Sequence, residues 1–189
     1  MNLKERIIES VAKFINLYGV KRFTVDDIAK DLSISKKTVY KYFSSKDELV
    51  SELVRISIED NISSTLDAVE KEDTIIGKLN AALLSHHKYQ IPLEILKGIQ
   101  RFYPKDWERI EEQRKFKLKL VRDIIHEGIE TGKLRKDINI EVLSLILDKS
   151  TSAIFEYDFL VENNLNINNA VREIEKILLY GMLDNNRYL

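Results

Sequence analysis

The chain has 189 residues, of which 44% are hydrophobic and 32% charged, and its formal net charge is −1. This composition is too apolar for a disordered protein, and the absence of cysteine excludes disulfides, thiolate metal sites and a cysteine nucleophile. With only 6 glycines and 2 prolines among many Leu, Ile, Lys and Glu residues, the sequence predicts an all-α fold. We expect neither a signal peptide nor a membrane span, and therefore a cytoplasmic protein.

The first predicted helix covers the N-terminal segment, where apolar residues from Leu3 to Tyr18 recur every three or four positions. Gly19 is expected to end it, as glycines commonly end helices. Thr24 is the expected N-cap of a second helix, because its hydroxyl can accept a hydrogen bond from the first turn. Ser35 has the same position before a third helix that runs to about Tyr42.

The second and third helices are separated only by a short turn at Ser33 and Ile34. Two helices joined in this way form a helix-turn-helix, whose second helix enters the major groove of DNA. Val39 and Phe43, four residues apart, are predicted to face the core, so the remaining side chains of the third helix point outward. The sequence therefore predicts a DNA-binding head.

The segment from Lys36 to Lys46 contains four lysines and no acidic residue. A basic segment on a nearly neutral chain is the charge distribution expected of a DNA-binding head on a body that does not bind DNA. The predicted DNA contacts are Ser35, Lys36, Lys37, Thr38, Tyr40, Lys41, Tyr42 and Lys46.

A long helix is predicted from the serine-to-glutamate capping pattern at Ser45 and Glu48 to about Glu70. About five further helices follow, including long ones over 105–131, 141–162 and 169–183. We predict a helix-turn-helix DNA-binding domain over residues 1–60 and a helical ligand-binding and dimerisation domain over residues 61–189.

Four segments together resemble the TetR family of bacterial transcriptional regulators, and the likeness covers about the first fifty residues. They are 24–29 (TVDDIA), 34–35 (IS), 38–43 (TVYKYF) and 45–49 (SKDEL). The resemblance implies a homodimer of all-helical subunits, each with a three-helix head, a connecting fourth helix and a C-terminal domain that binds a small effector. Carried over by position, it implies phosphate contacts by Tyr40, Tyr42 and Lys46, and base contacts by Lys36, Lys37 and Thr38.

Two residues depart from the family pattern. Ser33 stands where the family commonly has a glycine, and we expect it to adopt the turn conformation with modest strain. Lys37 stands where a small residue is usual and adds a positive charge to the surface that faces DNA.

The C-terminal part offers weaker predictions. Aromatic residues with a polar group suit ligand contacts between helices, and Tyr89, Trp107 and Tyr157 are the predicted ones. The apolar faces of the last two helices predict self-association, with Phe155, Ile174, Leu178 and Gly181 at a dimer interface.

Two pairs of residues contain side chains of the types that bind metals. The adjacent His86 and His87 point about 100° apart on a helix, and Asp123 with His126 lacks further ligands, so no metal site is predicted. No catalytic residue and no cofactor is expected, only an unknown small-molecule effector.

The predicted function is sequence-specific transcriptional regulation, by a homodimeric repressor that a small-molecule effector releases from a palindromic double-stranded DNA operator. Two alternatives stay open. An all-helical enzyme or metal-carboxylate protein would need clustered Glu and His ligands on facing helices. A module that binds an acidic protein through the basic head would show no preference among DNA sequences.

Overall fold

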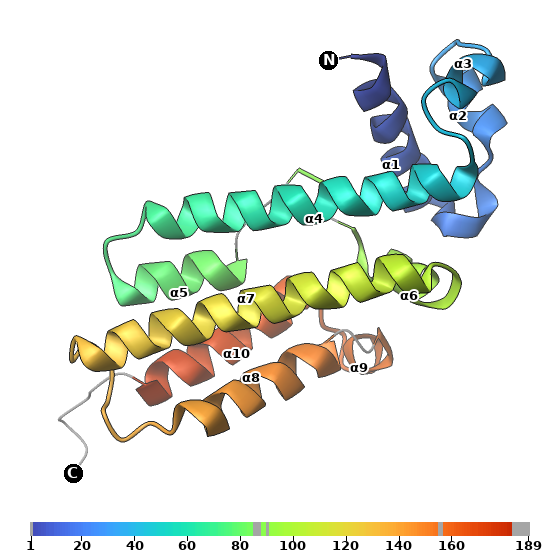
Figure 1. Ribbon diagram of the computed structural model, residues 1–189. Helices are drawn as coiled ribbons and strands as arrows, with labels where there is room; N and C mark the ends of the chain where they lie inside the picture. The colour runs from blue at the N-terminus through green and yellow to red at the C-terminus, as the bar shows by residue number, and fades with distance from the viewer. Residues whose placement is uncertain (1, 85–87, 90, 155–156, 183–189) are drawn as a thin grey trace. The chain divides into compact units, whose positions relative to one another are not determined.

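The structure is a computed structural model that describes residues 2–84, 88–89, 91–154 and 157–182. In these ranges the regular elements are helices, which confirms the predicted all-α fold (Figure 1). They are α1 (Leu3–Arg22), α2 (Val25–Asp31), α3 (Lys36–Tyr40), α4 (Lys46–Glu70), α5 (Ile75–Leu84), α6 (Leu93–Phe102), α7 (Pro104–Glu130), α8 (Ile140–Ile154), α9 (Tyr157–Glu162) and α10 (Ile167–Met182).

Most helix boundaries agree with the sequence prediction to within two residues. The helix predicted over 141–162 is described in two parts, α8 to Ile154 and α9 from Tyr157, and residues 155–156 lie outside the described residues. In the described part of the chain, no helix is both long and apolar enough to cross a membrane.

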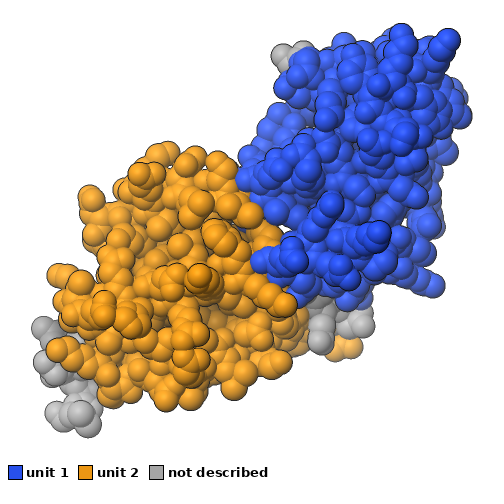
Figure 2. Space-filling view, in the orientation of Figure 1, with its two compact units in different colours: residues 1–61, 87–112 blue, residues 62–86, 113–189 orange. Residues whose placement is uncertain are grey.

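The chain forms two compact units (Figure 2). Unit 1 comprises residues 1–61 and 87–112, and unit 2 comprises residues 62–86 and 113–189. Helices α4 and α7 each contribute residues to both units. The functional boundary near residue 60 stays a prediction, and unit 1 includes α6 in addition to the predicted head.

Unit 1 has its core between α1, α2, α3 and the first half of α4. Ile7, Ile28, Val39 and Leu49, one from each of these helices, are completely buried. Gly19 leaves the helical conformation inside α1, with φ +79° and ψ 167°, and one more turn follows to Arg22. This conformation is accessible essentially only to glycine, which explains the residue at that position.

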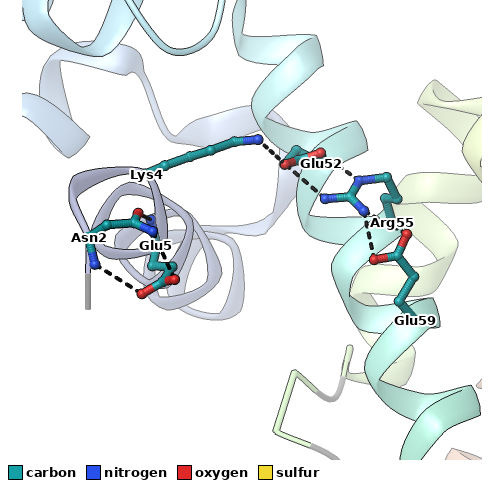
Figure 3. A network of polar contacts seen from close by, with 6 residues as sticks. All are labelled: Asn2, Lys4, Glu5, Glu52, Arg55 and Glu59. Carbon is teal, nitrogen blue, oxygen red and sulfur yellow. Dashed lines mark hydrogen bonds and ion pairs between the residues drawn. The ribbon is translucent and has the colours of Figure 1, made fainter.

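A polar network fastens α1 to α4 within unit 1 (Figure 3). The ammonium of Lys4 lies 2.7 Å from Oε1 of Glu52, and Nε of Arg55 donates to the other carboxylate oxygen at 2.8 Å. Arg55 also pairs with Glu59 at 2.6 Å. The hydrogen bonds from Arg55 and Lys4 lower the pKa of Glu52 to about 2. Glu52 is therefore ionised at neutral pH and fixes the first helix of the head on α4.

Helix α6 packs closely on α1. A Cβ at Gly98 would lie 2.9 Å from Cγ2 of Val20, so the Val20 side chain packs in the space that a larger residue at position 98 would fill. The start of α7 is joined to α4 as well, because the Tyr103 hydroxyl donates to Asp47 at 3.0 Å and the Ser51 hydroxyl to the buried Asp106 at 2.6 Å. The head therefore shares its core with α6.

Unit 2 is built around a separate apolar cluster. Its members come from α5, α7, α8 and α10 and from the turn after α7: Ile75, Leu79, Ala82, Val121, Ile124, Ile125, Leu134, Leu143, Leu147 and Met182.

Candidate DNA-binding site

The site begins with the start of α2, whose capping depends on residues three apart. The Thr24 hydroxyl accepts from the backbone N–H of Asp27 at 3.2 Å, and the Asp27 carboxylate accepts from the N–H of Thr24 at 2.8 Å. These bonds satisfy two donors at the helix start and lower the pKa of Asp27. The predicted N-cap at Thr24 is confirmed.

The turn between α2 and α3 follows a Schellman pattern centred on Ser33. Ser33 has φ +53°, its N–H donates to the Lys30 carbonyl at 3.1 Å, and the N–H of Ile34 donates to the Ala29 carbonyl at 2.9 Å. Ser33 thus adopts the left-handed conformation expected from its place in the turn. This turn fixes the direction in which α3 leaves α2.

Helix α3 is short, and its direction is fixed by its cap and by its buried side. The Ser35 hydroxyl accepts from the N–H of Thr38 at 3.0 Å, which confirms Ser35 as the N-cap. Val39 is completely buried and Phe43 is 2% exposed, as predicted. The helix ends at Tyr40 rather than at Tyr42.

The predicted contact residues lie on the side of this segment that faces away from the buried Val39 and Phe43. Tyr40 and Tyr42 are 44% and 43% exposed, although tyrosine usually buries most of its ring. Thr38 is half-buried, and the three lysines of this segment, Lys36, Lys37 and Lys41, are exposed. The structure therefore brings cations and hydroxyl groups together on one outward surface, the arrangement that phosphate and base contacts require.

One of these lysines has a partner in α2. The ammonium of Lys36 lies 3.0 Å from Oδ2 of Asp26, and both side chains are about half exposed. The hydrogen bond to Asp26 raises the pKa of Lys36. Asp26 occupies one of the three N–H donors of Lys36 and offsets part of its positive charge, and the other two donors are left for DNA.

Lys46 has a structural contact that the sequence did not reveal. Its ammonium donates to the backbone carbonyls of Lys21 at 2.8 Å and Phe23 at 2.7 Å, and it lies 4.3 Å from the centre of the Phe23 ring. Burial lowers the pKa of Lys46. These contacts join the start of α4 to the junction of α1 and α2. An ammonium has three N–H donors, so one of them is left for a phosphate.

The start of α4 differs in detail from the predicted capping box. The Ser45 hydroxyl accepts from the N–H of Glu48 at 3.1 Å, as expected. The Glu48 carboxylate, however, accepts from the N–H and the hydroxyl of Ser44, at 2.5 and 2.7 Å. The preceding serine therefore completes the cap and fixes the chain between α3 and α4.

The predicted ligand residues belong to different units. Tyr89 and Trp107 belong to unit 1, where both are partly buried. Tyr89 lines a cavity between α1, α4 and α6. Tyr157 belongs to unit 2, and its side chain lies outside the described residues.

The predicted dimer residues have different environments. Leu178 packs against the apolar cluster of unit 2, Ile174 is partly buried, Gly181 is exposed, and Phe155 lies outside the described residues. Helices α8 and α10 also expose several large apolar side chains. Their exposed fractions are 53% for Val142, 56% for Leu145, 47% for Ile146 and 72% for Ile177.

Within the described ranges, no three His, Asp or Glu side chains are grouped as metal ligands. The imidazole of His126 lies 3.4 Å from Glu130, one helical turn away, and His86 and His87 lie outside the described residues.

A three-helix head that presents lysines and tyrosines on the second helix of a helix-turn-helix defines a class of helical DNA-binding proteins. Residues 7–53 match the family model of bacterial regulatory proteins of the tetR family. The head of this chain is therefore similar to that of the tetR family, and a relative along most of its length is a transcriptional repressor.

Relatives along most of the chain agree with this similarity. The HTH-type transcriptional repressor KstR2 of Mycobacterium tuberculosis is 27% identical over 156 residues, which are 77% of this chain and 76% of the repressor. A transcriptional regulator from Saccharomonospora viridis, solved in complex with choline, has a TM-score of 0.76 at 14% identity and covers 96% of this chain and 98% of its own. FadR from Bacillus subtilis, solved in complex with stearoyl-CoA, has a TM-score of 0.64 at 17% identity. The match covers 94% of this chain and 98% of FadR. The two structures share the fold of this chain.

Proposed function

We propose that the protein is a homodimeric repressor that occupies a palindromic operator and is released from it by a small-molecule effector. The observation that carries the proposal is the outward surface of α3, where exposed lysines and tyrosines lie opposite the buried Val39 and Phe43. In a helix-turn-helix this surface faces the major groove.

We assign two kinds of contact to this surface. Tyr40, Tyr42 and the remaining N–H of Lys46 hold the phosphate backbone, because hydroxyl and ammonium groups donate to phosphate oxygens. Lys36, Lys37 and Thr38 approach the bases and carry the sequence preference. Ser35, which precedes the base contacts, and Lys41, which lies between Tyr40 and Tyr42, complete the proposed contact surface.

The first experiment selects bound sequences from a pool of random duplexes and then measures Tyr42→Phe on the selected operator. Removing one hydroxyl should weaken operator binding roughly ten-fold or more, because a hydrogen bond to a charged group contributes about 1.5–3 kcal/mol. Tyr18→Phe is a matched control, because Tyr18 is 53% exposed on α1, outside the predicted contact surface.

Equal affinities of the two variants would refute the contact assigned to Tyr42. Competition between the selected operator and random DNA separates a sequence-specific regulator from a basic head that binds acidic proteins. A regulator prefers its operator by orders of magnitude, about 10³-fold or more. An equal affinity for both DNAs would contradict the proposed function.

For the dimer, we propose that α8 and α10 pair with the same helices of a second copy. The exposed Leu145, Ile146 and Ile177 are the apolar surface that such an interface would bury. Dimerisation would hold two α3 helices at the spacing of successive major grooves.

Sedimentation of Ile177→Glu tests this interface, since a buried carboxylate should disrupt the dimer and lower operator affinity. Leu17→Glu is the matched control, because Leu17 is 62% exposed on α1. A dimeric Ile177→Glu protein would exclude this interface.

For the effector, the relatives support only a small molecule. The two related structures contain chemically different ligands, choline in one and stearoyl-CoA in the other. A ligand releases the repressor only if it binds the DNA-competent and DNA-incompetent conformations with different affinities.

A further inference from the structure

Unit 1 contains a cavity of about 60 Å³ at the base of the DNA-binding head. It lies between α1, α4 and α6, and its walls are mostly apolar, with Ile15 from α1, Leu53 from α4 and Ile95 from α6. The cavity is partly open to solvent, and its apolar walls favour an apolar group, because contact with them removes hydrocarbon surface from water. The walls therefore select a hydrocarbon group.

The mouth of the cavity is polar. Lys88 and Tyr89 line it, and the ammonium of Lys88 lies 4.8 Å from the centre of the Tyr89 ring. This ammonium also pairs with Glu9 of α1 at 2.8 Å. A guest with an apolar body and one polar end would match both parts of the cavity.

The segment at the mouth is fastened to α4 by hydrogen bonds. The N–H groups of Lys88 and Tyr89 donate to Oδ2 of Asp60 at 2.6 and 3.2 Å, and the Ser57 hydroxyl donates to the Tyr89 carbonyl at 2.5 Å. Together with the Lys88–Glu9 pair, these bonds connect the segment to both α1 and α4. A guest that displaces it therefore loosens contacts to the head.

The walls also connect the head with α6. The Val20 side chain of α1 lies so close to the Gly98 backbone of α6 that a Cβ at Gly98 would be 2.9 Å from Cγ2 of Val20. A guest larger than the cavity must move one of its walls, because packed interiors have little free space. Moving α1 changes the orientation of the head that carries α3.

We propose that this cavity binds a small amphipathic molecule, with its hydrocarbon end against Ile15, Leu53 and Ile95 and its polar end at Lys88, and that occupancy weakens DNA binding. The effect on DNA rests on the proposed repressor function, whereas the binding itself does not. Tyr89, predicted as a ligand contact from the sequence, would lie at the entrance.

The test uses 1-hexanol as the probe, and 1,6-hexanediol, which has a hydroxyl at both ends, as the matched probe control. Methyl NMR of the full-length protein follows Ile15, Leu53 and Ile95 during titration. We expect saturable shifts with 1-hexanol and an at least ten-fold weaker response to the diol, because its second hydroxyl would be buried without a partner.

Ala12→Leu extends a side chain into the cavity from α1, where Ala12 lines the wall. It should abolish the shifts, whereas Ala68→Leu, the same exchange at a partly buried alanine of α4 outside the cavity, should retain them. Should Ala12→Leu fail to fold, Val54→Ile adds a single methylene to the wall and is expected to weaken binding several-fold.

Saturating 1-hexanol should lower operator affinity at least three-fold in the unaltered protein and leave Ala12→Leu unaffected. Absence of saturable shifts, equal binding of the diol, or unchanged binding by a folded Ala12→Leu protein would overturn the site. Binding without a change in operator affinity would overturn its regulatory effect. If no duplex is selected at all, the repressor function fails, while the NMR titration still decides whether the site exists.

Discussion

The ammonium of Lys46 joins the start of α4 to the end of α1, and Lys46→Met should remove this connection while keeping an apolar side chain of similar length. Two hydrogen bonds are lost, to the carbonyls of Lys21 and Phe23. A hydrogen bond to a charged group contributes about 1.5–3 kcal/mol. Lys46 is only partly buried, so water can partly replace it at the two carbonyls. We therefore expect a loss of about 2 kcal/mol in the free energy of unfolding.

For a chain of this length, about 2 kcal/mol lowers the melting temperature by roughly 4–8 °C. Thermal unfolding followed by circular dichroism measures this change. Lys41→Met is the control, because Lys41 is an exposed lysine in the same segment and should unfold within about 1 °C of the unaltered protein. An unchanged melting temperature of Lys46→Met would refute the structural role of the ammonium.

The same variant tests the proposed phosphate contact by an independent measurement. Each phosphate that a protein neutralises contributes about −0.9 to the slope of log affinity against log salt concentration. A dimer that loses two such contacts should therefore show a slope that is shallower by about 1.8. A lower melting temperature with an unchanged slope would leave Lys46 with its structural role alone.

Three further substitutions test other parts of the head. Asp26→Asn should raise operator affinity about three-fold at low salt, because it frees Lys36 and removes a negative charge near DNA. Fluorescence anisotropy measures the operator affinity. Weaker operator binding by Asp26→Asn would contradict the proposed contact between Lys36 and DNA. Gly19→Ala forces alanine to φ +79° and should lower the free energy of unfolding by about 1–3 kcal/mol. Urea denaturation measures this loss, and an unchanged midpoint would contradict the positive φ at residue 19. Glu52→Gln should cost about 1–2 kcal/mol at pH 7, because Arg55 and Lys4 hold the Glu52 pKa at about 2. This contribution is complete above the ordinary glutamate pKa and is lost as the pH falls towards 2, so the two proteins should converge in acid unfolding. A pH-independent difference would point to packing instead.

The helix-turn-helix could be predicted from the sequence because its signals are local. The hydroxyls of Thr24 and Ser35 reach backbone groups only three residues ahead, so the residues alone identify these helix starts. The four-residue spacing of Val39 and Phe43 determines which side of α3 is buried, whatever the rest of the chain does. The outward surface, and with it the predicted DNA contacts, follows from these local rules.

Long-range contacts were decided only by the tertiary structure. Lys46 was predicted from its position to contact phosphate, but its carbonyl partners lie 23 and 25 residues earlier in the chain. The apolar stripe of α10 predicted self-association without telling which residues turn outward, and the packing of Leu178 on unit 2 leaves Ile177 exposed.

The cavity at the base of the head is assembled from positions as distant as Ala12 and Ile99. The sequence pattern predicts its apolar lining residues as ordinary helix core. Of the residues that line the cavity, only Tyr89 was predicted from the sequence as a ligand contact. Periodicity shows which side of a helix is buried. It does not show which helices meet there or whether they leave a space between them, because these depend on how side chains from separate helices fit together in three dimensions.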